Sequence, residues 1–142
     1  MYQKDFILRM IEMLAELVAG ILGLIKKGDY QKASQSIDDA YQDLLKQDAG
    51  FFNNIPLGKL TDNLIQEHNF TNGHLEILSE LFYTQAELSF AQNKHTESLE
   101  FYQKSLCLME FVIKESQTFS FEKQSKISFI QNRIVELKNV GS

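Results

Sequence analysis

The sequence of 142 residues contains no tryptophan, one cysteine and one proline. A single cysteine cannot form an internal disulfide, so nothing indicates an oxidising compartment. Cys107 lies in the apolar stretch KSLCLMEFV, which predicts a small buried side chain and not a reactive thiolate. Pro56 is the only strong helix breaker, so the rest of the chain can form long helices. No segment alternates apolar and polar residues, and we therefore predict an all-α protein without strands.

Basic residues are also scarce, because 14 Lys and Arg residues stand against 19 Asp and Glu residues. Nucleic acids and anionic membrane surfaces both recruit Lys and Arg, so the net charge of −5 argues against either as a partner. The apolar fraction of 44% is too high for a disordered chain. A chain of this length is long enough for a single domain, 1–142, with a sizeable core.

The longest apolar stretch, FILRMIEMLAELVAGILGLI, is interrupted by Arg9, Glu12 and Glu16. A membrane-spanning helix needs about 20 mostly apolar residues, so this stretch is a poor candidate for one. It also lacks the basic start, unbroken apolar middle and small-residue cleavage site of a signal peptide. We therefore expect a cytoplasmic protein.

No catalytic or cofactor motif is present. His68 and His74 lie six residues apart in EHNFTNGHLE, a spacing that matches no standard set of metal ligands, so we expect a solvated loop and no metal. Asp38 and Asp39 are adjacent and point to different parts of a helix surface, which makes them a poor acid–base pair. The sequence therefore predicts no enzyme activity and no cofactor.

The first 47 residues predict two helices joined by a tight turn, a hairpin over 4–47. Gly28 is placed to end a helix over 4–27, and Asp29 to cap a helix over 30–47. The apolar arc of the first helix is wider than one neighbour can cover, so this helix is either central or part of a subunit interface. The candidate residues for a homodimer interface are Val18, Leu22 and Ile25.

The remaining segments predict further helices. A connection over 48–74 is rich in Gly and Asn but contains Phe51, Phe52 and Phe70, which are costly to leave in water, so we expect it to be ordered. A second hairpin follows over 75–115, with helices at about 75–92 and 96–115. Apolar residues at steps of three and four then predict a final helix over 118–139, capped by Thr118 or Ser120.

The two hairpins resemble each other in sequence. When GDYQKASQSIDDAY is set above NKHTESLEFYQKSL, small, large and small residues align, with Ala33, Ile37 and Ala40 above Ser98, Tyr102 and Ser105. This pattern resembles the helical hairpins of tetratricopeptide arrays. The segments KDFILRMIEML and GDYQKASQSIDDAYQDLL also resemble the opening of a bacterial family that has tetratricopeptide-like helices and no assigned function. The resemblance implies the fold and a bacterial source, and no activity.

One charge feature stands out, because no Lys or Arg occurs between Lys59 and Lys94. An acidic stripe, defined here as Glu76, Glu80, Tyr83 and Glu87, follows steps of four, three and four along the predicted helix 75–92. Such a stripe usually faces water, and we favour that interpretation. The alternative is a docking face for a basic peptide or partner, since the resemblance implies that the first helix of each hairpin lines a concave groove.

By elimination, the sequence favours a non-enzymatic helical-repeat protein that acts as a protein–protein interaction module. A structural homo-oligomer, with the first helix at the subunit interface, is the alternative.

Overall fold

The computed structural model describes residues 2–117 and 120–140, with side chains from residue 7 onward. Five long helices account for most of the chain, and short helical turns connect the second of them to the third. The elements in order are α1 (Tyr2–Lys27), α2 (Tyr30–Leu45), α3 (Ala49–Asn53), η1 (Leu57–Lys59), α4 (Leu60–Asp62), η2 (Asn63–Glu67), α5 (Asn72–Ala91), α6 (His95–Ser116) and α7 (Phe121–Val140). No strand occurs within these ranges, which confirms the all-α prediction for the described residues.

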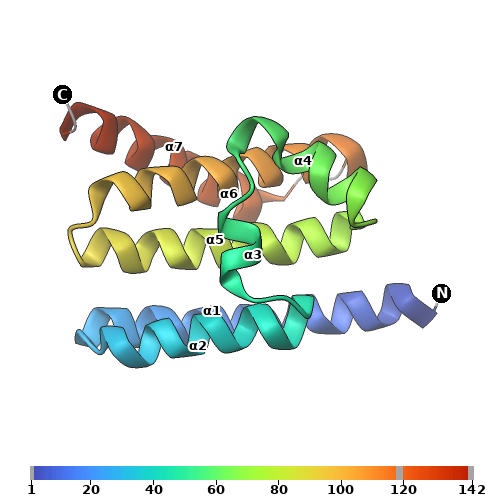
Figure 1. The fold of residues 1–142 in the computed structure, drawn as a ribbon, viewed down its shortest axis with the longest axis horizontal. Helices are drawn as coiled ribbons and strands as arrows, with labels where there is room; N and C mark the ends of the chain where they lie inside the picture. The colour runs from blue at the N-terminus through green and yellow to red at the C-terminus, as the bar shows by residue number, and fades with distance from the viewer. Residues whose placement is uncertain (1, 118–119, 141–142) are drawn as a thin grey trace.

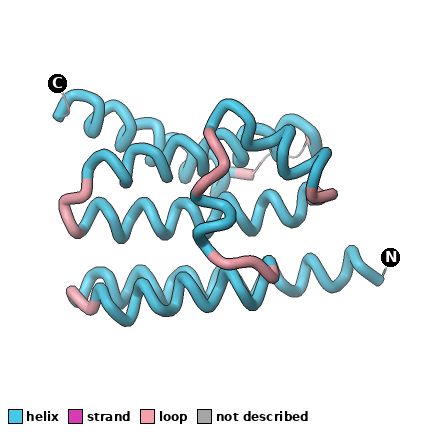
Figure 2. Tube along the Cα trace, in the orientation of Figure 1, coloured by secondary structure: helices cyan, strands magenta, loops and turns pink. Residues whose placement is uncertain are grey.

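The long helices are stacked in layers (Figure 1). α1 and α2 lie side by side in one layer, α5 and α6 follow, and α7 packs on α6. The segment from α3 to η2 crosses from the end of α2 over α5 to α6, and loops interrupt its short helical turns (Figure 2). The predicted connection over 48–74 therefore contains ordered turns in place of a further pair of long helices.

α1, α5 and α7 run in the same direction (Figure 1). Gly73, at the start of α5, lies against Ile7 near the start of α1. At the other end, the Tyr30 hydroxyl, just after α1, donates a hydrogen bond to the Ala91 carbonyl at the end of α5. α7 contacts α5 through ion pairs that follow the same order along both helices, from Glu76–Lys123 to Glu87–Arg133, as expected for parallel helices.

The central helix is α5. For α1, the sequence predicted either this central position or a place in a subunit interface. α5 packs against α1, α2 and α6, and its buried residues occur on every side of the helix. It contributes to both hydrophobic clusters of the core. One cluster joins α1, α2 and the connecting segment to α5 and α6, and the other joins α5, α6 and α7. The width of the apolar arc of α1 is explained by its contacts with both α2 and α5.

Small residues let the paired helices approach closely. Ala33 and Ala40 of α2 are 0% and 2% exposed and lie in the first cluster. At the matching positions of α6, the hydroxyl of Ser98 donates to the Ala86 carbonyl and that of Ser105 to the Ser79 carbonyl, both in α5. The larger residues between them, Ile37 and Tyr102, are fully buried. The aligned small-large-small pattern thus corresponds to equivalent burial in both pairs of helices.

The helix ends follow from local chemistry. Gly28 has a φ of 85°, a left-handed conformation that glycine adopts without strain, and the Asp29 carboxylate caps α2. α5 begins three residues before the predicted start, because the Thr71 side chain and the His74 ring form a reciprocal capping box. The Ser120 hydroxyl accepts a hydrogen bond from the backbone N–H of Lys123 at the start of α7. The other proposed cap, Thr118, lies outside the described residues.

The connecting segment is tied to the core by one aromatic residue and one lysine. Phe52 is fully buried and stacks with Tyr41 of α2. Lys104 of α6 is 1% exposed, and its ammonium donates a hydrogen bond to the Asn53 carbonyl at 2.8 Å and pairs with Glu100 at 3.2 Å. A buried charge is costly unless it is paired, and Glu100 of the same helix supplies that pairing. The hydrogen bond to Asn53 joins α3 to α6.

Candidate functional site

The acidic stripe of α5 is in contact with α7. The carboxylate of Glu76 lies 2.5 Å from the ammonium of Lys123, and that of Glu80 lies 2.7 Å from the ammonium of Lys126. Lys126 also lies over the ring of Tyr83, 4.7 Å from its centroid. Burial, together with the nearby acids, raises the pKa of Tyr83 to about 12, so its hydroxyl stays protonated at neutral pH.

A more buried contact follows at the far end of the stripe, around Arg133 of α7. Its guanidinium stacks on Phe90 at 3.7 Å and on Phe129 at 4.9 Å from the ring centroids. Arg133 also donates a hydrogen bond to the Tyr102 hydroxyl at 3.2 Å, and this hydroxyl in turn donates to Glu87. The pKa of Tyr102 is raised, mainly by burial and further by the hydrogen bond to Glu87. The guanidinium of Arg133 also lies 3.6 Å from the carboxylate of Glu87, so Arg133, Tyr102 and Glu87 form one network.

The expectation that the acidic stripe faces water is therefore wrong. The side chains of Glu76, Glu80 and Glu87 are only 17–23% exposed, because α7 covers them. The three acids meet the three cations in the same order along both helices, which makes α5 and α7 parallel. An outside basic partner at this stripe would have to compete with α7. That binding role of the stripe stays a prediction.

An open groove runs beside these contacts, between α1 and α7. It encloses about 380 Å³, and α5 and α6 form its floor. The wall from α1 is apolar and the wall from α7 is charged. The residues lining it are Ile11, Leu14, Ala15, Val18, Ala19, Leu22, Glu76, Ser79, Glu80, Met109, Val112, Glu122, Lys123 and Lys126. This volume lies within the range of about 300–1,000 Å³ that is typical of ligand pockets.

The residues predicted for a subunit interface are largely buried within the fold. Val18 is 5% exposed and belongs to the core, while Leu22 and Ile25 are half-buried and pack against it. Val18 and Leu22 also line the groove, whereas Ile25 does not. Among the side chains of α1 that the structure describes, Leu8 and Met13 are the most exposed large apolar residues, at 51% and 60%. A homodimer stays a prediction.

Cys107 was predicted to be buried, but its side chain is only half-buried. Burial, together with the nearby Glu110, raises the pKa of its thiol. Within residues 2–117 and 120–140, no group of three or more His, Cys, Asp or Glu side chains is close enough to hold a metal ion. None of the helices in these ranges has the length and apolar character needed to cross a bilayer.

A second cavity of about 330 Å³, lined mainly by polar side chains, lies among α2, α3, α5 and α6.

Sequence reasoning identified the acidic half of this site and missed its basic half. The steps from Glu76 to Glu80 and Glu87 are four and seven, and those from Lys123 to Lys126 and Arg133 are three and seven. This near match between the spacing of the acids and that of the cations was the one signal in the sequence for contact between the two helices. The match indicates a contact only when the direction and packing of α7 are known.

Comparisons with known proteins add no further restriction on function. No protein-family model matches the chain, and no curated protein and no solved structure matches it either. The site must therefore be interpreted from its own residues.

Proposed function

We propose that the chain is a non-enzymatic protein–protein interaction module, built as a tetratricopeptide-like helical array, which receives a partner in the groove between α1 and α7. The observation that carries the proposal is the open apolar wall of this groove. Ala15 and Ala19 line it and are exposed, whereas Leu14 and Val18 beside them are buried in the core. Exposed apolar surface next to charged residues is typical of interaction sites.

The arrangement of the helices supports an array. α1, α5 and α7 are parallel and form the two walls and part of the floor of the groove, as the first helices of successive hairpins would. The equivalent burial of Ala33 and Ser98, and of Ala40 and Ser105, supports a repeated unit. Both units are longer than the roughly 34-residue tetratricopeptide period, because α1 and α2 together extend from Tyr2 to Leu45, and α5 and α6 from Asn72 to Ser116.

A structural homodimer is the second candidate. The exposure of Leu8 on α1 favours it, because a subunit contact would bury this large apolar side chain and so stabilise the assembly. Light scattering at micromolar concentration distinguishes the candidates. A monomer with an open groove supports the interaction module, and a dimer dispersed by Leu8→Glu supports the structural role.

Selection of helical peptides from a randomised library tests the interaction function without assuming the charge of the partner. The parent chain is the target, and an Ala15→Phe variant, which fills the groove from an exposed position, is used for counter-selection. We expect peptides that bind the parent and lose affinity for the variant. A Gln42→Phe variant, on the exposed surface of α2, is the matched control. Recovery of no peptide whose binding depends on Ala15 would contradict the proposal.

A further inference from the structure

The shape of the α1 wall fits the side chains of a helix. Ile11 and Leu22 form its two ends, and Ala15 and Ala19 lie between them. The wall extends over three turns, or about 16 Å at a rise of about 1.5 Å per residue. Two alanines one turn apart leave a shallow recess between the larger residues, which can receive apolar side chains from an adjacent helix. This arrangement matches the binding of an amphipathic helix in a hydrophobic groove.

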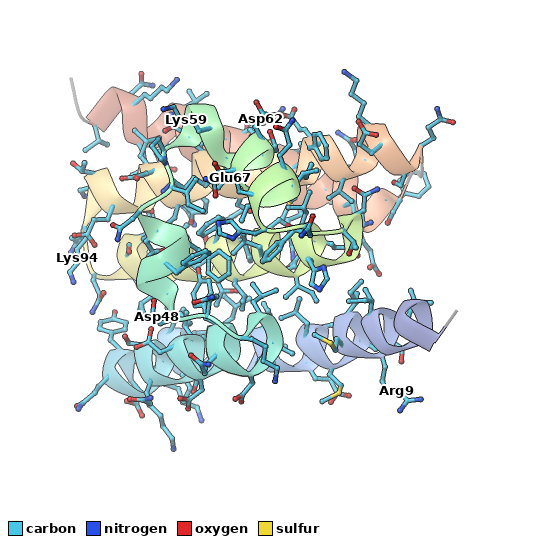
Figure 3. All side chains as sticks on the ribbon, turned by 45° about the vertical axis from the view of Figure 1, so that its right-hand side comes forward. Arg9, Asp48, Lys59, Asp62, Glu67 and Lys94 are labelled. Atoms are coloured by element: carbon cyan, nitrogen blue, oxygen red, sulfur yellow. The ribbon has the colours of Figure 1, made fainter. Side chains whose placement is uncertain are left out.

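The charges around the recess are unbalanced. Glu12, Ala15 and Ala19 are spaced by three and four residues, so Glu12 shares their face of α1, and it is exposed. On the opposite wall, Glu122 is exposed and lines the groove. Arg9, the nearest cation on α1, points away from the other helices (Figure 3).

The lysines of the groove do not remove this imbalance. Lys123 and Lys126 are each paired with one acid of α5, Glu76 and Glu80 respectively. Three carboxylates and two ammonium groups line the groove, and Glu12 beside it adds a fourth carboxylate. A carboxylate is thus left on each side of the recess with no groove lysine paired to it.

The chain itself shows what kind of helix this acidic surface binds. α7 buries isoleucines, including Ile130 and Ile134, while its cations contact the acids of α5. Its buried strip is therefore apolar and is flanked by Lys and Arg. The acids left over at the rim of the groove offer the same chemistry to a second helix.

We infer that the partner bound in the groove is a basic amphipathic helix, an inference that rests on the proposed interaction function. Its apolar strip contacts Ile11, Ala15 and Leu22, and its flanking Lys or Arg side chains contact Glu12 on one side and Glu122 on the other. Electrostatic attraction of this kind mainly sets specificity and the rate of association, and salt weakens it.

Two synthetic helical peptides provide the test. Both are 18-residue peptides (about five turns) with the same leucine strip, and they differ only in carrying Lys or Glu at the flanking positions. Binding of each labelled peptide to the full chain is measured by fluorescence anisotropy at low and high salt. We expect the lysine peptide to bind about tenfold or more tightly than the glutamate peptide at low salt, with the difference shrinking as salt rises.

Variants locate the binding. Ala15→Phe should weaken binding of the lysine peptide about tenfold, and Glu12→Lys about threefold to tenfold at low salt. Gln42→Phe and Asp43→Lys, which make matched changes on the exposed surface of α2, should leave binding unchanged. Circular dichroism checks that each variant is folded.

Several outcomes would overturn the inference. Preference for the glutamate peptide, with binding lost in Ala15→Phe, rejects the basic partner and leaves the interaction function intact. Binding of the lysine peptide that ignores Ala15→Phe, or no binding of either peptide, rejects the assignment of this partner to the groove. A parent dimer that Ala15→Phe converts to a monomer assigns the groove to a second copy of the chain.

Discussion

Arg133 should contribute more to stability than other cations of α7, because it meets Phe90, Phe129, Tyr102 and Glu87 at once. Its side chain is only 20% exposed. Each cation–π contact contributes about 0.5–1 kcal/mol in a partly exposed setting. A hydrogen bond to a charged group adds about 1.5–3 kcal/mol, and the residual exposure reduces that value. We expect Arg133→Met, which keeps the aliphatic packing, to lower the free energy of unfolding by about 2–3 kcal/mol.

Urea denaturation followed by circular dichroism measures this loss, and the denaturant dependence should stay unchanged. Lys138→Met is the matched control, since Lys138 is exposed near the end of the same helix, and a change within about 0.5 kcal/mol is expected there. Combining Arg133→Met with Glu87→Gln should give a coupling of about 1 kcal/mol. Equal effects of Arg133→Met and Lys138→Met, or no coupling, would refute the argument that this network holds α7 on α5.

Three further predictions concern packing and pH. Ala33→Leu should overpack the contact around α2 and cost about 1–3 kcal/mol by urea denaturation, and a variant as stable as the parent would contradict the close packing. Gly73→Ala should lower the melting temperature, because its Cβ would overlap the Cγ2 atom of Ile7; an unchanged melting temperature would show that α1 does not approach α5 there. Burial lowers the pKa of His74, whose Nδ1 atom accepts a hydrogen bond from the Thr71 N–H. The unfolded chain therefore binds this proton more readily, so the contribution of His74 to stability is complete above about pH 6.5 and is lost as the pH falls below it. His74→Gln should flatten that part of the stability profile measured by urea denaturation between pH 5 and about pH 8, and an equally steep profile would rule out His74 as its source.

Features that depend on neighbouring residues in the sequence could be predicted. Gly28 and Asp29 mark a helix boundary by their own conformational and capping properties, and the spacing of Ala33, Ile37 and Ala40 fixes the buried face of α2 whichever helix covers it. The start of α5 was misplaced because its capping box uses a histidine in place of the usual Glu or Gln.

Features that depend on the choice of packing partner could not be predicted. A helix with acids at steps of four and seven is consistent with a solvated face, a docking face or an internal contact. The choice among them depends on where α7 lies. The groove exists because α7 packs on α6 and reaches α5 through Glu80 and Glu87, and so leaves Ala15 and Ala19 of α1 uncovered. No local sequence pattern in α1 or α7 predicts where α7 lies relative to α1.

The order of the helices along the chain has a consequence for folding. α5, α6 and α7 follow one another through short links, so their contacts close small loops at low entropic cost. The contacts of α1 with α5 join residues about 66 positions apart, such as Ile7 and Gly73, and should form later. During synthesis, however, α1 and α2 emerge first. The apolar faces of α1 and α2 that pack against α5 therefore stay exposed until α5 has been synthesised. We expect the nascent chain to be prone to aggregation or chaperone binding during this interval.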